Sequence, residues 1–242
     1  MHQFFSEKVV TLPGCYLPND SGRLISPIEP SRAEQGLPKD GFVFGSFNSS
    51  YKIQPAVFAH WMNLLRQIEH SVLWLSPMSD ASRANLIKEA ERGGVAPERL
   101  VFSSRTDRPE DHLARLRLID LFLDTPGYNG HATTCDALWA GVPVVTCIGE
   151  TFAGRVAASA LAAVGLPEMI SGTLKEYETL ALGLARDPTR LAALRNKLAS
   201  NRISHLLFDT DRFARHLEAA YTAMHARAQQ GGPALAIAIP SD

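Results

Sequence analysis

Short apolar runs alternate with amphipathic segments from residue 41 to about residue 150. Continuous apolar runs of this kind are typical of strands that are buried on both faces of a parallel sheet, and they occupy 42–47, 71–75, 100–102, 121–123 and 144–146. The three- and four-residue spacing of apolar positions between them predicts helices after Pro55 and over 80–92, 109–118 and 132–140. The alternation predicts an α/β fold, a Rossmann-like doubly wound parallel sheet with its ligand at the carboxyl edge of the strands.

The segments on either side of this pattern differ from it. Residues 1–40 carry prolines at positions 13, 18, 27, 30 and 38 and show little periodicity, which predicts an extended, proline-rich arm. Residues 41–228 form the predicted lobe, because helices are expected to continue over 154–164, 174–186, 188–200 and 211–228. Two glycines and two prolines in 229–242 favour a disordered tail.

Composition removes several classes of function. The chain has 242 residues, 45% of them hydrophobic, which is enough for a sizeable core, and its formal charge is -1. Nucleic acid and anionic membrane are therefore not expected partners, because no overall basic field exists to attract them. No apolar run is long enough to span a bilayer, and the first residues lack the pattern of a signal peptide. The three cysteines show no metal-ligand spacing, so we expect a soluble, cytoplasmic protein with free thiols.

The stretch from Leu123 to Thr146 holds the most informative chemistry. A buried strand ends at Asp124, a loop with two glycines follows, and a helix opens near residues 131–134. Unpaired amides in the first turn of that helix and its dipole favour an anion. Thr133 and Thr134 add hydroxyl groups, and Gly130 permits a close approach to the backbone. An ordinary loop with a threonine cap would look similar, and the stretch has neither the lysine of a P-loop nor a G-x-G-x-x-G motif.

Three segments together resemble one family. They are Asn-Gly-His-Ala-Thr-Thr-x-Asp-Ala-Leu-Trp-Ala-Gly-Val-Pro-Val-Val-Thr (129–146), Gly-Glu-Thr-Phe-Ala-Gly-Arg-Val-Ala-Ala-Ser (149–159) and Phe-Asn-Ser-Ser-Tyr-Lys-Ile (47–53). In their order along the chain they resemble the O-linked N-acetylglucosamine (O-GlcNAc) transferases, including bacterial SPINDLY-like homologues, over about residues 5–221. The resemblance implies the C-terminal, donor-binding lobe of a GT-B glycosyltransferase, which transfers N-acetylglucosamine from UDP-GlcNAc to protein Ser or Thr with inversion.

The resemblance also assigns roles to individual residues. It implies that Lys52 is catalytic because its ammonium reaches the donor diphosphate and stabilises the leaving UDP. The other residues that it implies for UDP-sugar binding are Ser49, His112, Arg115, Gly130, His131, Ala132, Thr133, Thr134 and Asp136. Helix amides and Lys52 neutralise the diphosphate in this scheme, so neither a cofactor nor a metal is expected. The Asp-Thr-Asp sequence at 209–211 fits helix N-capping better than metal binding.

The family places its candidate catalytic base, part of the acceptor site and its tetratricopeptide repeats upstream of the segment matched here. We therefore expect a protein acceptor and an N-terminal catalytic lobe as partners, and negligible transfer by this chain alone. Other readings stay open. The chain could be a non-catalytic nucleotide-binding or interaction module, or a relative that transfers glucose from UDP-glucose to Asn or fucose from a GDP donor to Ser or Thr.

Overall fold

The computed structural model describes residues 5–241 and confirms the predicted parallel sheet. The strands of the main sheet are β2 (Val43–Ser46), β3 (Val72–Leu75), β4 (Leu100–Phe102), β5 (Leu121–Leu123), β6 (Val144–Cys147) and β7 (Ile170–Ser171). They pair in the order β4-β3-β2-β5-β6-β7, and all of these pairs are parallel. This is the doubly wound order, in which the chain moves outward from the centre in both directions. The two-residue strand β7 was not predicted, because it is too short to leave a periodic pattern.

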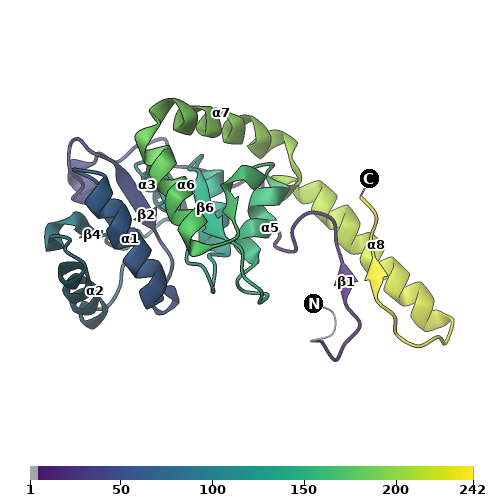
Figure 1. Cartoon of the computed structure of the whole chain (residues 1–242). Helices are drawn as coiled ribbons and strands as arrows, with labels where there is room; N and C mark the ends of the chain where they lie inside the picture. Colours follow the sequence, from purple (N-terminus) through teal and green to yellow (C-terminus); the bar gives the residue numbers. More distant parts are fainter. Residues whose placement is uncertain (1–4, 242) are drawn as a thin grey trace.

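Helices cover both faces of the sheet (Figure 1). They are α1 (Pro55–Gln67), α2 (Asp80–Arg92), α3 (Pro109–Leu116), α4 (Ala132–Trp139), α5 (Val156–Ala163), α6 (Leu174–Arg186), α7 (Pro188–Ser204) and α8 (Thr210–Gln229). Single 3₁₀ turns are η2 (Ala33–Gln35), η3 (Ser50–Lys52), η4 (Pro97–Arg99), η5 (Pro167–Met169) and η6 (Leu206–Phe208). Helices α1 and α6 pack together, whereas α4 contacts α3 and α5. No helix within residues 5–241 is long and apolar enough to cross a membrane.

Most of the long helices begin at a residue whose chemistry favours a helix start. Ser79, Thr173, Asp187 and Asp209 cap α2, α6, α7 and α8 by accepting a hydrogen bond from a first-turn amide. The structure thereby confirms the N-capping role predicted for Asp209. Helices α1, α3 and α5 have no such side-chain cap, and neither has α4, whose N-cap residue is His131. The first turn of α4 is left open.

A buried aromatic chain links the core to the carboxyl edge of the sheet. Trp61 and Tyr177 are fully buried. The indole Nε1 of Trp61 donates to the Tyr177 hydroxyl at 3.0 Å, and that hydroxyl donates to the backbone oxygen of Asp124 at 3.0 Å. Burying each large apolar side chain contributes about 1.5–3 kcal/mol, so the packing that stabilises the lobe also positions the end of β5.

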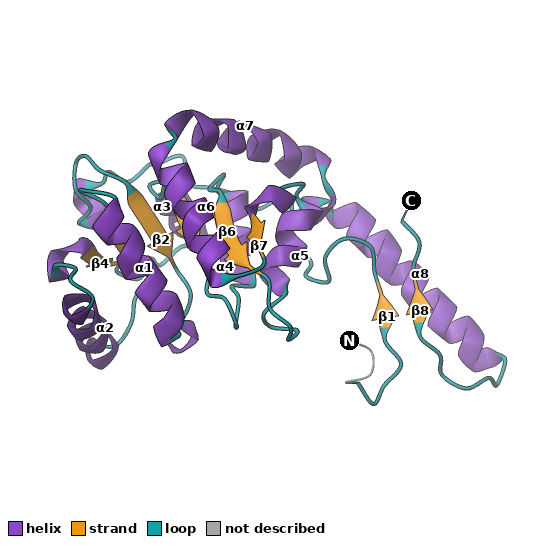
Figure 2. Ribbon diagram, in the orientation of Figure 1, coloured by secondary structure: helices purple, strands orange, loops and turns teal. Residues whose placement is uncertain are grey.

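The two ends of the chain lie together outside the main lobe. Strand β1 (Val10–Thr11) pairs in parallel with β8 (Ile237–Ala238) beside α8, which extends away from the sheet (Figure 2). The arm is extended in the described residues, and residues 230–241 include the short strand β8; the disorder predicted for 229–242 stays a prediction. Gly231 turns the chain with a φ of 67°. The apolar run 234–239 contains β8. This strand was not predicted, because the glycines and prolines around it indicate irregular structure.

Candidate functional site

The candidate site lies where the strand order of the sheet reverses. Strands β2 and β5 are neighbours, yet the chain leaves them in opposite directions. Ligands of doubly wound folds bind in the crevice at the carboxyl ends of such strands. In this protein the crevice receives residues 47–52 after β2 and residues 124–131 after β5, which contain four of the ten predicted site residues: Ser49, Lys52, Gly130 and His131.

Asp124 holds the two sides of this crevice together. Its side chain is fully buried. Oδ1 accepts hydrogen bonds from the Gly130 amide at 2.6 Å and the Asn48 side-chain amide at 3.3 Å, and Oδ2 accepts one from the Thr146 hydroxyl at 2.6 Å. Burial raises the pKa of Asp124, while these hydrogen bonds act in the opposite direction. One carboxyl group therefore connects the ends of β2, β5 and β6 to the loop before α4.

The loop before α4 uses many of its own polar groups internally. Thr133 donates its hydroxyl to Asn48 Oδ1, and Thr134 donates its hydroxyl to the Gly130 oxygen at 3.0 Å. A Cβ atom at Gly130 would lie 2.6 to 2.7 Å from oxygens of Thr133, Asn48 and Thr134. Glycine is thus required by the packing of the loop itself. The donors that the loop leaves for a ligand are backbone amides, since the first-turn amides of a helix have no partner within it.

Lys52 reaches this loop from the other side of the crevice. Its Nζ donates to the Asn129 oxygen at 2.8 Å and lies 4.1 Å from the centre of the Tyr128 ring. Burial lowers the pKa of Lys52, and the charge of Asp124 opposes that shift. Within residues 5–241 the ammonium forms no ion pair with a carboxylate. A partly desolvated ammonium that has no carboxylate partner is stabilised when it binds an anionic ligand.

His131 is the N-cap residue of α4. Its Nδ1 lies 3.3 Å from the hydroxyl of Tyr16, a residue of the arm. Burial lowers the pKa of His131, the nearby charge of Lys52 lowers it further, and the Ala153 backbone opposes both. The neutral ring is therefore the favoured form, and it stands at the end of the helix where an anion would bind.

A second group of predicted residues lies where α3 contacts α4. His112 and Arg115 belong to α3, and Asp136 belongs to α4. The Arg115 guanidinium is almost completely buried and donates to His112 Nδ1 at 2.9 and 3.2 Å. Because Nδ1 accepts, the proton of the neutral imidazole belongs on Nε2, which faces Asp136 Oδ2 at 4.0 Å. Burial and the charge of Arg115 lower the pKa of His112. This group presents a carboxylate oxygen and an imidazole N–H, which suit the hydroxyls and base of a nucleoside.

The remaining predicted residues, Ser49 and Ala132, make few contacts with the rest of the site. Ser49 is exposed, and only its backbone oxygen is used, by the amide of Lys52 at 3.0 Å. Ala132 is exposed at the start of α4. Sequence reasoning did not identify Asn48 or Asp124 as the residues that organise the loop. The position of Asp124 directly after a fully apolar strand was the one feature that could have identified it.

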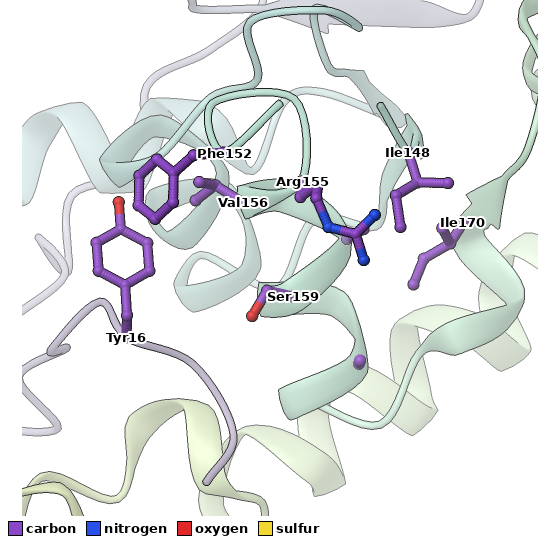
Figure 3. A pocket seen from close by; sticks show the side chains of 9 residues that line it. Tyr16, Ile148, Phe152, Arg155, Val156, Ser159 and Ile170 are labelled. Atoms are coloured by element: carbon purple, nitrogen blue, oxygen red, sulfur yellow. The ribbon is translucent and has the colours of Figure 1, made fainter. Parts of the chain in front are cut away.

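A mostly apolar pocket of about 450 Å³ adjoins the site. Figure 3 shows the rings of Tyr16 and Phe152 at one side of it and the Arg155 side chain directed away from them, toward Ile148 and Ile170. The two rings pack edge to face with their centres 5.0 Å apart. Because Tyr16 also contacts His131, the pocket and the helix terminus share one wall. In the described part of the chain, no group of three His, Cys, Asp or Glu side chains is arranged to hold a metal ion.

The sheet is Rossmann-like, and at its switch point an uncapped helix terminus and a lysine that forms no ion pair within residues 5–241 favour an anionic ligand. The profile described as Glycosyl transferase family 41 matches residues 23–217. The chain belongs to this glycosyltransferase family, as the sequence resemblance predicted, and its fold is that of a GT-B lobe.

Individual relatives give the same result. The chain is 39% identical over 235 residues to the probable UDP-N-acetylglucosamine–peptide N-acetylglucosaminyltransferase SEC of Arabidopsis thaliana, covering 93% of this chain and 24% of that protein. It is 38% identical over 203 residues to the Caenorhabditis elegans UDP-N-acetylglucosamine–peptide N-acetylglucosaminyltransferase, covering 84% and 18%. A mutant O-GlcNAc transferase of Thermobaculum terrenum superposes with a TM-score of 0.82 at 36% identity, covering 95% and 44%. The chain thus spans about a quarter or less of these two curated relatives.

Proposed function

We propose that this chain binds the nucleotide-sugar donor in an inverting glycosyltransferase that moves N-acetylglucosamine from UDP-GlcNAc to Ser or Thr hydroxyls of proteins. Family membership supports the reaction class. The printed names of the Arabidopsis and C. elegans relatives support the sugar, the nucleotide and a peptide acceptor. The acceptor site and the catalytic base belong to the whole transferase, and the donor site belongs to this lobe.

One observation carries the proposal: two kinds of positive charge converge at the switch point. The first turn of α4 has no side-chain cap, so its amides are available to an anionic ligand at the switch point. Lys52 adds a full charge from the β2 side, held near the same loop by its bond to the Asn129 oxygen at 2.8 Å. A diphosphate placed there would meet amides on one side and an ammonium on the other.

The proposed roles follow from this geometry. Lys52 stabilises the charge that develops on UDP as the bond between the sugar and the phosphate breaks. The amides of residues 132–134 hold the diphosphate beside His131. Asp136, His112 and Arg115 hold the nucleoside. Because the helix terminus and Lys52 already supply positive charge, donor binding is expected to need no metal ion, and chelation by EDTA should leave the affinity unchanged.

The test is calorimetric titration of the full chain with UDP, UDP-GlcNAc, UDP-glucose, GDP and GDP-fucose. We expect micromolar binding of UDP and UDP-GlcNAc. Lys52→Met should weaken UDP binding about 30- to 100-fold, the value of one charge-assisted hydrogen bond in a partly buried site. Lys88→Met, a change at an exposed lysine of α2, is the matched control and should have no effect.

Other outcomes would select the alternatives. Preference for GDP-fucose or UDP-glucose would assign a different donor to the same site. Absence of binding to every nucleotide would favour a non-catalytic interaction module. Equal UDP affinity of the wild type and Lys52→Met would remove Lys52 from the site.

A further inference from the structure

Part of the N-terminal arm is built into the wall of the candidate donor site. The backbone oxygen of Arg23 accepts a hydrogen bond from the Trp139 indole at 3.1 Å, and the Ser26 amide donates to the Glu110 oxygen at 3.1 Å. Asn19 donates to the Leu207 oxygen at 3.2 Å. These contacts hold the arm against the helices that carry the nucleoside group, so its side chains are fixed relative to that group.

Arg23 makes the closest charged contact to this group. Its Nη1 lies 2.7 Å from Oδ1 of Asp136, and the two side chains are only 29% and 16% exposed. The other carboxylate oxygen, Oδ2, faces His112 Nε2 at 4.0 Å, too far for a direct hydrogen bond. The two carboxylate oxygens of Asp136 therefore differ in their hydrogen bonding. One is bound by the arm, and the other faces the crevice.

We infer that Arg23 is a positioning residue of the donor site, which holds Asp136 so that Oδ2 is presented to the hydroxyls of a ribose. A charge-assisted hydrogen bond to one oxygen restricts rotation of the carboxylate. The second oxygen then keeps its acceptor capacity in a fixed direction, and a ribose hydroxyl can donate to it without first ordering the side chain. This inference rests on the proposed function, because it takes a nucleoside diphosphate as the ligand.

A purely structural role for the pair makes a different prediction. If Arg23 only attached the arm to α4, its loss would lower stability, or weaken all ligands to the same extent. If Arg23 positions Asp136, its loss should affect the contribution of the ribose hydroxyls alone. The informative quantity is the ratio of affinities for UDP and for 2′,3′-dideoxy-UDP, which lacks both hydroxyls.

The experiment measures both affinities by calorimetry for the full chain and three variants. The wild type should prefer UDP over the dideoxy analogue by about tenfold, the low end of the range for a hydrogen bond to a charged group. Arg23→Ala should weaken UDP binding by about the same factor and leave the analogue unchanged, so that the preference disappears. Arg23→Lys keeps the charge but not the planar fork and should restore part of the preference.

Arg32→Ala is the matched control. Arg32 is also an arginine of the arm, and its guanidinium also pairs with an aspartate, but that residue is Asp120 at the opposite edge of the sheet, at 3.3 Å. This variant should keep the wild-type preference. Should Arg23→Ala unfold, Arg23→Met retains the apolar stem and replaces it.

Two failures can be distinguished. Equal preference for UDP in the wild type and in every folded Arg23 variant, or an equal loss for both nucleotides, would overturn the inference and leave the proposed function intact. A wild-type chain that binds neither nucleotide would overturn the proposed function, and the inference with it.

Discussion

Strand β5 has an aspartate at each end, and the protein treats the two in opposite ways. Asp120, before the strand, lies 3.3 Å from an arginine of the arm and 3.7 Å from Arg195 of α7, and it accepts a hydrogen bond from the Val43 amide at 2.8 Å. Asp124, after the strand, has no arginine or lysine within salt-bridge distance in the described residues. Neutral donors alone hold it.

The difference shows which edge of the sheet is closed and which is available. At the amino edge the protein's own cations neutralise its carboxylate, and α7 covers the strand ends through bonds from Arg195 to the oxygens of Ile119 and Asp120. At the carboxyl edge Lys52 donates only to a carbonyl and the first turn of α4 is uncapped. Positive charge is left uncompensated there, which is what an anionic ligand requires.

The largest effect is expected from Asp124→Ala. Removal of the carboxyl leaves the Gly130 amide and the Thr146 hydroxyl buried without an acceptor, whereas the Asn48 amide keeps the Thr125 hydroxyl as its acceptor. Because each such group costs about 1–3 kcal/mol, the free energy of unfolding should fall by about 3–5 kcal/mol, and UDP binding should be lost with the loop geometry. Urea denaturation and UDP titration measure both quantities.

Asp124→Asn is the companion variant. It keeps one acceptor for the Gly130 amide, and the Thr146 hydroxyl can rotate to accept from the new amide. It should therefore lose less than half as much stability. If alanine and asparagine at this position behave alike, Asp124 does not organise the loop through these hydrogen bonds.

A smaller and separable effect is expected from Asp120→Ala. This change removes the acceptor of the Val43 amide and leaves two arginines without their carboxylate, which should cost about 1–3 kcal/mol of unfolding free energy. UDP affinity should remain that of the wild type, because the change lies at the closed edge. A loss of UDP affinity comparable with that of Lys52→Met would show that the two edges are not independent.

The smallest effect concerns pH. The pKa of His112 is lowered in the folded protein, chiefly by burial, from its ordinary value of 6.5. As pH falls through 6.5, the unfolded chain takes up a proton that the folded chain resists, so stability should decrease on acidification. The pKa of Asp124 is raised in the folded protein. At lower pH the folded chain therefore binds this proton more readily than the unfolded chain, and this contribution to stability increases on acidification. Denaturation at pH 7.5 and 5.5 should show a flatter dependence for His112→Gln than for the wild type.

Much of the fold followed from local pattern alone. The apolar runs predicted five strands of the sheet, and the predicted bounds of 80–92 and 174–186 agree with α2 and α6. These elements were accessible because burial on both faces of a sheet requires continuous apolar residues, and burial on one face of a helix requires a spacing near 3.6. The short strand β8 was not predicted, because it depends on pairing with a strand more than two hundred residues away.

The site divides differently. The sequence by itself determined the chemistry available: the family, a lysine after the first strand of the lobe, and a glycine-containing loop that opens a helix. Tertiary structure alone decided how those groups are used. It placed the hydroxyls of Thr133 and Thr134 on acceptors inside the loop, made Asp124 the centre of a buried network, and brought Arg23 of the arm to Asp136. Local sequence restricts backbone conformation within a few residues, whereas these contacts join residues that only the packing of the whole lobe brings together.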